Sequence, residues 1–286
     1  MLALVDNNFA QRAGMRDYLA ASPANRAVIP HTLMEEWHKK EAGRTTRLSL
    51  QIACAYPRQI MIMRDTVELM HMSGGRWGLL LRLIDRSQTR NFSAYCDTVI
   101  NAPLDAELEA RFSAHEGFTS ERMGLLEKEA EKIWTLFAKW DDPTHPDGFT
   151  DRQRRQMSGL IGRRAHLPAG LQEKTLKLAM RHAGANFQKH SVPADRIPVD
   201  RPEMANLLSF RYGAMLVALY VYWKSEHGNT YPSNRRQVLA WLSDIKIAAQ
   251  ATYFDEFKTG EKKLRPVYEI GLSMIKALGG YTNCGR

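Results

Sequence analysis

The chain has 286 residues, of which 44% are hydrophobic and 25% are charged, and its 40 Lys and Arg against 31 Asp and Glu give a net charge of +9. This composition is ordinary for a globular protein with a sizeable core. No stretch approaches the roughly 18 apolar residues of a membrane span, and residues 1–12 do not resemble a signal peptide. The positive charge favours polyanionic partners, although charge alone does not establish nucleic-acid binding.

The three cysteines are scattered along the chain at Cys54, Cys96 and Cys284. None forms a CxxC pair, which argues against a structural zinc site. Because three is an odd number for a disulfide framework, we expect free thiols in a reducing compartment, and hence a cytoplasmic protein.

The first part of the chain alternates short apolar runs with helical patterns. The sequence predicts strands at 2–5, 26–30 and 59–64, and helices at 8–21, 32–44 and 47–56. The middle, from about 66 to 190, is mostly helical, with candidates at 104–112, 120–140 and 171–182. A loop rich in Asp, Pro and Gly covers 141–151, and three prolines mark 192–202 as a linker.

Helices and one strand are predicted again towards the C-terminus. A long helix is expected over 203–226 and another over 235–242, after a turn at 229–234. Ser243 is the expected N-cap of a third helix over 244–251. A strand at 252–258 and a helix at 269–278, ended by Gly279 and Gly280, complete the chain.

Strands at both ends with helices between them indicate one α/β domain built from the two ends of the chain. We therefore expect residues 1–64 and 203–286 to form a discontinuous domain around a mostly parallel sheet. Residues 65–202 would be an α-helical insertion.

Four acidic patterns stand at the ends of predicted strands or helices. They are LALVDNNF with Asp6 and Asn8, VIPHTLMEEW with Glu35 and Glu36, LSDIKIAAQA with Asp244, and TYFDEFKTGEKKL with Thr259 and Glu261. Ligands collect beyond the carboxyl ends of strands in open α/β sheets. Clustered carboxylates suit hard cations such as Mg²⁺ or Mn²⁺, which neutralise phosphate charge and activate water.

These patterns resemble, in matching order, those of the PIN-domain nucleases. That family has a strand ending in Asp with Asn two residues later, as at Asp6. It has a Glu on the helix after the second strand, as at Glu35 three residues after Thr32. It has a D-x-x-I-A-A helix, as at Asp244, and a strand leading into Thr-x-Asp. The last motif departs from the family, because Glu261 replaces Asp.

The resemblance implies a PIN-like three-layer fold and a metal-dependent endoribonuclease. Asp6, Glu35 and Asp244 would bind Mg²⁺ or Mn²⁺, and Glu261 would be the fourth catalytic carboxylate. Asn8 and Thr259 would orient these groups. RNA is the expected substrate, with DNA as an alternative, and membranes are not expected partners. A toxin or defence effector, a neutralising or regulatory protein partner and a homo-oligomer are compatible with such a nuclease.

Several alternatives stay open. Glu36 competes with Glu35, and each acid alone could be a helix cap or a solvated side chain. The chain could also be a non-catalytic PIN-like scaffold that binds nucleic acid or protein. Basic side chains of the insertion could grip the RNA backbone or form a solvated face; they are Arg152, Arg154, Arg155, Arg163, Arg164, Lys174, Lys177 and Arg181.

Overall fold

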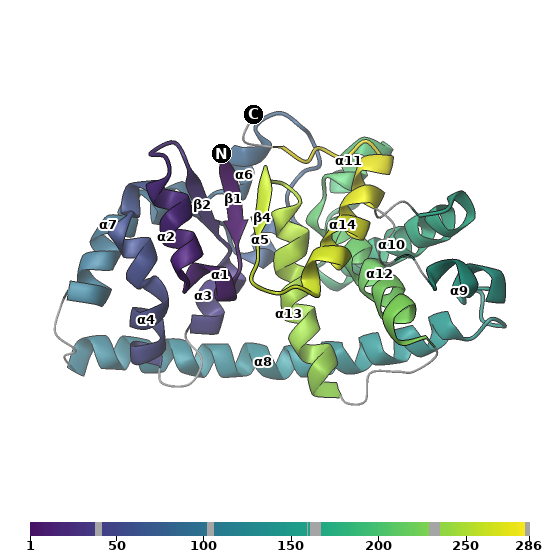
Figure 1. Ribbon diagram of the computed structural model, residues 1–286, viewed down its shortest axis with the longest axis horizontal. Helices are drawn as coiled ribbons and strands as arrows, with labels where there is room; N and C mark the ends of the chain where they lie inside the picture. Colours follow the sequence, from purple (N-terminus) through teal and green to yellow (C-terminus); the bar gives the residue numbers. More distant parts are fainter. Residues whose placement is uncertain (38–41, 102–105, 159, 161–166, 229–234, 284–286) are drawn as a thin grey trace.

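A four-stranded, all-parallel sheet with the order β3-β2-β1-β4 lies at the centre of the α/β fold. The computed structural model describes residues 1–37, 42–101, 106–158, 160, 167–228 and 235–283. The strands are β1 (Leu2–Val5), β2 (Arg26–Ile29), β3 (Ile60–Ile62) and β4 (Glu256–Lys258). Each falls inside a predicted strand, so the two ends of the chain do meet in one sheet (Figure 1).

Helices surround the sheet. They are α1 (Asn7–Ala10), α2 (Ala13–Ala20), α3 (His31–Trp37), α4 (Ala42–Ala55), α5 (Thr66–Met70), α6 (Leu79–Leu83), α7 (Arg86–Cys96), α8 (Ala106–Asp141), α9 (Asp151–Met157), α10 (Ala169–Lys189), α11 (Arg201–Ala205), α12 (Leu208–His227), α13 (Arg235–Ala251) and α14 (Leu264–Ala277). Short 3-10 turns occupy Pro57–Gln59 and Ala194–Arg196, and a π-helical turn occupies Asp97–Asn101. None of the described helices is long and apolar enough to cross a membrane.

Both faces of the sheet are buried, which explains why the strand sequences are almost continuously apolar. Side chains alternate along β1, so that Leu2 and Leu4 enter one hydrophobic cluster while Ala3 and Val5 enter another. Helices α1–α4 and α7 pack on the Ala3 face, and α12–α14 pack on the Leu4 face. The result is a three-layer α/β arrangement with a smaller and a larger core.

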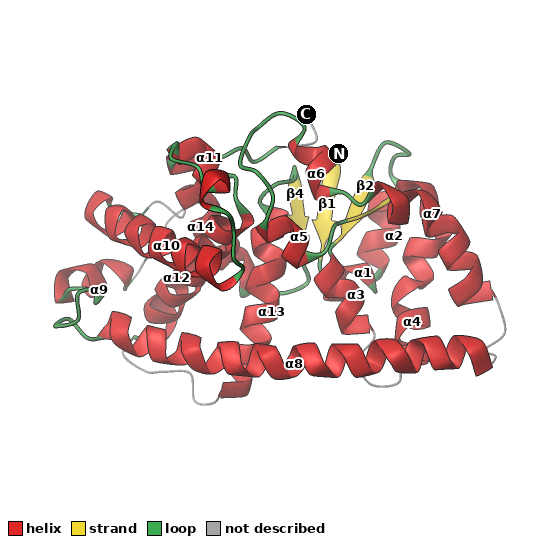
Figure 2. Cartoon of the chain, turned by 180° about the vertical axis from the view of Figure 1, so that it is seen from behind, coloured by secondary structure: helices red, strands yellow, loops and turns green. Residues whose placement is uncertain are grey.

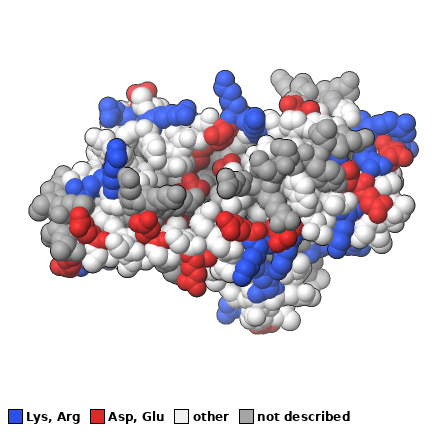
Figure 3. Space-filling view, turned by 90° about the horizontal axis from the view of Figure 1, so that it is seen from below, with Lys and Arg blue, Asp and Glu red and all other residues white. Residues whose placement is uncertain are grey.

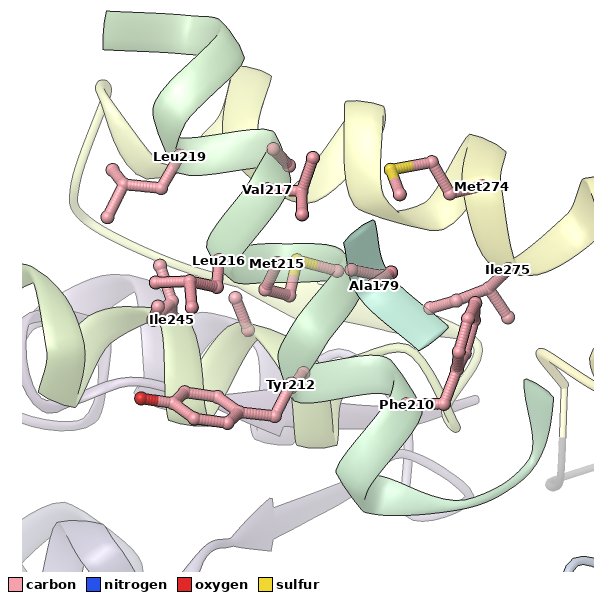
Figure 4. Packing of buried hydrophobic residues seen from close by; sticks show 14 of the residues in the cluster. Ala179, Phe210, Tyr212, Met215, Leu216, Val217, Leu219, Ile245, Met274 and Ile275 are labelled. Carbon is pink, nitrogen blue, oxygen red and sulfur yellow. The ribbon is translucent and has the colours of Figure 1, made fainter. Parts of the chain in front are cut away.

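The larger core is built around α12. Every residue from Leu208 to Lys224 is buried, because α10, α13 and α14 enclose this helix. Figure 4 shows side chains of α12 packed against Ile245 of α13 and Met274 of α14. A Cβ on Gly213 would lie 2.7 Å from the Ala179 carbonyl oxygen, so a glycine there permits α12 and α10 to approach closely.

Helix α8 joins the two cores. Its 36 residues extend about 54 Å at 1.5 Å per residue. Leu108 and Phe112 pack in the smaller core, whereas Ile133, Phe137 and Trp140 pack in the larger one. Figure 2 shows α8 running along the side of the molecule towards which the strands point. The sequence predicted two helices here; burial of both ends keeps the intervening segment helical as well.

Other helix boundaries also differ from the predictions. The helix expected over 8–21 is divided at Gln11 and Arg12, and the helix expected over 203–226 is divided at Asn206 and Leu207. The Asn206 side chain bonds to the Gly74 carbonyl oxygen and the Tyr281 amide, which favours a helix break there. Ser243 is not an N-cap, because α13 is continuous from Arg235. The turn predicted at 229–234 lies outside the described residues.

A buried arginine ties the C-terminal segment to the larger core. Arg211 on α12 is fully buried and donates hydrogen bonds to the carbonyl oxygen of Ala205 (3.0 Å) and to Oγ1 of Thr252 (2.9 Å). A further bond goes to the Tyr281 carbonyl oxygen (2.5 Å), and the guanidinium carbon lies 3.6 Å from the centre of the Tyr253 ring. Because each donor has an oxygen acceptor, the buried charge is tolerated.

Cys54 and Cys96 form a disulfide, with their Cα atoms 5.4 Å apart. The expectation of free thiols was therefore wrong for this pair. The bond joins α4 to the end of α7 across 42 residues of sequence. The spacing of the cysteines in the sequence does not predict this disulfide, because Cys54 and Cys96 meet only when α4 and α7 pack on the smaller core. Cys284 lies outside the described residues.

The disulfide predicts the number of thiols that react. Without reductant, the denatured chain should present one reactive thiol of its three cysteines, and all three after reduction. Alkylation under denaturing conditions followed by mass spectrometry measures this. Three reactive thiols in protein purified without reductant would contradict the pairing.

A polar cluster lies between α8, α10, α12 and α13. Glu129 accepts a hydrogen bond from Tyr212 Oη (2.9 Å) and lies 3.2 Å from Lys246 Nζ and 3.8 Å from Lys189 Nζ. Burial alone would raise the pKa of Glu129, but the lysine charges and the hydrogen bonds hold that pKa below its usual value. Burial lowers the pKa of His182 to about 4, against the weaker opposing effect of the Glu129 charge.

The neutral imidazole predicts a loss of stability in mild acid. The unfolded chain binds a proton at His182 near pH 6.5, whereas the folded protein does so only near pH 4. Acidification between these values favours unfolding, by up to about 1.4 kcal/mol per pH unit. Urea unfolding at pH 7, 6 and 5 should show a flatter pH dependence for His182→Gln than for the wild type. The exposed control His115→Gln should keep the wild-type slope; equal slopes in all three proteins would refute the prediction.

Candidate functional site

The carboxyl ends of the strands meet at one edge of the sheet, and parallel pairing fixes which residues are neighbours there. Leu4 is in register with Val28 on β2 and with Phe257 on β4. Two residues further along each strand are Asp6, Pro30 and Thr259, so these positions share the edge. Neighbouring strands lie about 4.8 Å apart, which brings side chains that follow adjacent strands close to one another.

Asp6 follows β1 and is only 5% exposed. Its Oδ1 accepts a hydrogen bond from the Phe9 amide (2.7 Å) and caps α1, so that the carboxylate is held in place by the helix it begins. Its Oδ2 accepts bonds from Thr259 Oγ1 (2.5 Å) and from the Gly260 amide (3.2 Å). The backbone amide of Asp6 donates to the Lys258 carbonyl oxygen (3.1 Å), which completes the link to β4.

Glu261 is held beside Asp6 by the turn that follows β4. Its amide donates to Thr259 Oγ1 (2.9 Å), and its Oε1 accepts a bond from Asn8 Nδ2 (2.6 Å). A Cβ on Gly260 would lie 2.8 Å from the Asn8 Cβ, so only glycine fits without a shift. Asn8 and Thr259 thus form hydrogen bonds with the carboxylates of Glu261 and Asp6.

Glu35 belongs to a second group at the same edge. Its Oε1 lies 3.2 Å from His31 Nδ1, and the same nitrogen lies 3.2 Å from Asp65 Oδ2. His31 begins α3 directly after β2, and Asp65 caps α5 shortly after β3, where its Oδ1 accepts a bond from the Val67 amide (2.7 Å). Each of these three side chains is about one fifth to one quarter exposed, at 24%, 19% and 23% for His31, Glu35 and Asp65.

Asp244 is placed by α13, in the interior of that helix and not at its start. It is half-buried and lines a small cavity of about 50 Å³ between α12, α13 and α14. Glu261 and Lys263 line the same cavity. The structure thus places Asp244 and Glu261, 17 residues apart in the sequence, on the lining of one cavity.

The predicted acids therefore share one region but form separate local groups. Within the described part of the chain, one set of three possible metal ligands has all its atoms within 4.8 Å of one another, namely His31, Glu35 and Asp65. Glu35 joins this set and Glu36 does not. Asp6, Asp244 and Glu261 lie outside the set. Figure 3, seen from the side on which α8 lies, shows acidic side chains in the middle of this face with basic ones beside them.

Comparison with the models of known protein families, with curated protein sequences and with solved structures finds no match for this chain. The resemblance to PIN-domain nucleases consequently rests on the four motifs and their order. The parallel α/β fold agrees with the expected fold class at the level of layers and strand direction. The side chains at the carboxyl edge of the sheet carry the chemical information about function.

Sequence reasoning missed His31 and Asp65. A signal for both was present, because Asp65 follows the third predicted strand just as Asp6 follows the first. His31 stands four residues before Glu35, a spacing that puts both side chains on one face of a helix. The same rule of strand ends, applied to every predicted strand, would have selected them.

Basic residues of the insertion bond largely within the protein. Arg154 forms ion pairs with Asp151 and Asp141, and Arg181 forms an ion pair with Asp147. Lys174 donates to the carbonyl oxygen of Pro146 (3.1 Å). Arg163 and Arg164 lie outside the described residues. These partners reduce the charge that α9 and α10 present to a polyanion.

The hydrogen bond between Thr259 and Asp6 predicts that the Thr259 hydroxyl contributes to the stability of the fold. Thr259→Val removes the hydroxyl donor to Asp6 and the acceptor for the Glu261 amide without a change of volume. We expect the free energy of unfolding to fall by about 1–3 kcal/mol. Thr259→Ser keeps the hydroxyl and should lose less. Urea unfolding of the two variants measures the difference, and equal stability of Thr259→Val and wild type would show that the bond contributes nothing.

Proposed function

We propose that the protein is a metal-dependent nuclease that hydrolyses phosphodiester bonds in RNA at the carboxyl edge of the sheet. The observation that carries the proposal is the group of His31, Glu35 and Asp65 at that edge, where Asp6 also lies. Segments that follow all four strands supply the acids, as expected of a ligand site in an open parallel sheet. The fold and the motif order are compatible with the PIN-like assignment.

The ligand chemistry of this group fits a divalent cation. Two carboxylate oxygens and one imidazole nitrogen converge within 4.8 Å. Carboxylates suit Mg²⁺ and Mn²⁺, and an imidazole in the set favours Mn²⁺ of the two. A bound cation would supply positive charge to the phosphate oxygens and acidify a water molecule. Glu35 is common to this set and to the set implied by the motifs.

The remaining acids have distinct proposed roles. Asp6, held on both oxygens by neutral donors, would be a fixed negative charge at the edge where the cation binds. Asp244 and Glu261, which line the same cavity, would accept the proton of the attacking water or bind a second cation. Asn8 and Thr259 position Glu261 and Asp6.

A non-catalytic scaffold is the second candidate, and one observation favours it. Both oxygens of Asp6 already serve structure, one as the cap of α1 and the other as the anchor of the turn after β4. A scaffold of this kind would retain the acidic residues at the carboxyl edge for their structural hydrogen bonds and would not cleave RNA. Titration with Mn²⁺ separates the two candidates, since a scaffold has no need of the cation.

The cytoplasmic location stays a prediction, and the disulfide weakens its basis because such bonds are rare in the reducing cytosol. A role as a toxin or defence effector rests on the resemblance alone. DNA remains an alternative substrate, since metal-assisted phosphodiester hydrolysis does not by itself distinguish ribose from deoxyribose.

The nuclease proposal is tested with a mixed pool of single-stranded and structured RNA. The wild type should cleave the RNA when Mn²⁺ is present, and EDTA, which removes the cation, should abolish this cleavage. Asp6→Asn with Asp244→Asn should lower the rate by about a hundredfold or more, because the negative charge that supports the cation and the acceptor for the proton of the attacking water are both removed. Asn can still cap α1, so the fold should survive, and circular dichroism checks it.

Two further variants locate the metal. His31→Ala should raise the Mn²⁺ concentration for half-maximal cleavage by about tenfold, as loss of a ligand weakens binding. Asp195→Asn, an exposed acid in the linker, is the matched control and should behave as wild type. Undiminished cleavage by the Asp6/Asp244 variant would rule out the assigned site. If the protein binds RNA but does not cleave it with Mg²⁺ or with Mn²⁺, the non-catalytic scaffold is favoured.

A further inference from the structure

Arg12 lies over the turn that holds Asp6 and Glu261. It stands between α1 and α2, close to the N-terminus, whereas the turn follows β4 near the C-terminus. A Cβ built on Gly260 would lie 3.5 Å from Arg12 Nη1, so the guanidinium is in close contact with that turn. Sequence patterns do not predict this proximity, because the two segments meet only through the pairing of β1 with β4.

The guanidinium of Arg12 is exposed to solvent. Among the residues that the structure describes, no hydrogen-bond acceptor or carboxylate pairs with it, although Glu261 is close by. Glu261 instead accepts its bond from Asn8. The Arg12 side chain does not cap α2 either. An exposed arginine next to a cluster of acids, with no internal partner, is available to an anion from outside.

We propose that Arg12 binds a backbone phosphate of the RNA next to the scissile bond, which places the substrate across the turn of residues 259–261. This inference rests on the proposed nuclease function. Guanidinium binds phosphate with two parallel hydrogen bonds, which fixes orientation as well as adding affinity. Lys262 and Lys263 continue the positive charge beyond the turn, with Lys262 exposed.

The charge distribution favours this path over one along the insertion. Arg154 and Arg181 are paired with acids there, which would have to be displaced before phosphate could bind. Arg12 needs no such exchange. Arg152 and Arg155 of α9 are exposed as well, but α9 lies at the far end of the molecule from the strands (Figure 1). The acids at the edge also repel a polyanion, so a cation beside them is needed to hold the phosphate close.

Binding can be measured apart from cleavage. A fluorescein-labelled single-stranded RNA of mixed sequence is titrated with the full chain in EDTA at several KCl concentrations. We expect Arg12→Ala to weaken binding by about tenfold. The slope of log Kd against log salt should fall by about 0.7, the value for one phosphate contact on a single strand. Arg12→Lys should keep most of the salt slope while losing part of the affinity.

Matched controls test whether the effect belongs to this position. Arg58→Ala removes an exposed arginine before β3, at the opposite edge of the sheet, and should leave binding and slope unchanged. Arg155→Ala probes the insertion and should have a smaller effect than Arg12→Ala. In cleavage assays with Mn²⁺, Arg12→Ala should raise KM several-fold and change kcat less.

Each outcome decides the inference. Wild-type affinity and slope in Arg12→Ala would overturn it, as would an equal loss in Arg58→Ala or no RNA binding by the wild type. RNA binding that depends on Arg12 without any cleavage would refute the nuclease and leave the phosphate contact standing. Cleavage that is indifferent to Arg12 would refute the contact and leave the nuclease standing.

Discussion

The pairing of β1 with β4 is the constraint on which the rest of the structure depends. It joins segments 253 residues apart, through the Leu2 amide bonded to Asp255 and the Thr259 hydroxyl bonded to Asp6. Closing so long a loop costs about 5 kcal/mol in chain entropy. Burial of both faces of β1 offsets that loss, because each face contributes side chains to a different core. The same pairing creates the edge where the candidate site lies.

The described hydrogen-bond partners of Asp6 and Glu261 at this edge are all uncharged. Asp6 and Glu261 are held by neutral donors: a threonine hydroxyl, backbone amides and an asparagine amide. Such donors orient a carboxylate without cancelling its charge. The structure thus keeps negative charge concentrated where a fold built only for stability would have paired it with lysine or arginine. Arg12 stands beside this charge without neutralising it.

The sequence predicted what depends on neighbours in the chain and missed what depends on packing. Strands β1, β2 and β3 were found because buried parallel strands read as apolar runs, and Asp6 was found because it ends one of them. The continuity of α8, the break at Asn206 and the disulfide between Cys54 and Cys96 all arise from contacts between distant segments. Asp65 could have been predicted in the same way as Asp6, because it also follows a strand. Its proximity to His31 could not, because that depends on the pairing of β2 with β3.

A network of contacts connects α8 with α13, the helix that carries Asp244. Asp244 and Lys246 are two residues apart on this helix, and so point about 200° apart around its axis. Lys246 pairs with Glu129 of α8, and Glu129 also bonds to Tyr212 of α12. This buried set of contacts fixes the rotation of α13, and with it the direction in which Asp244 projects. Because α8 contributes side chains to both cores, Glu129 links the packing of α12 and α13 to a helix that is fixed at each end.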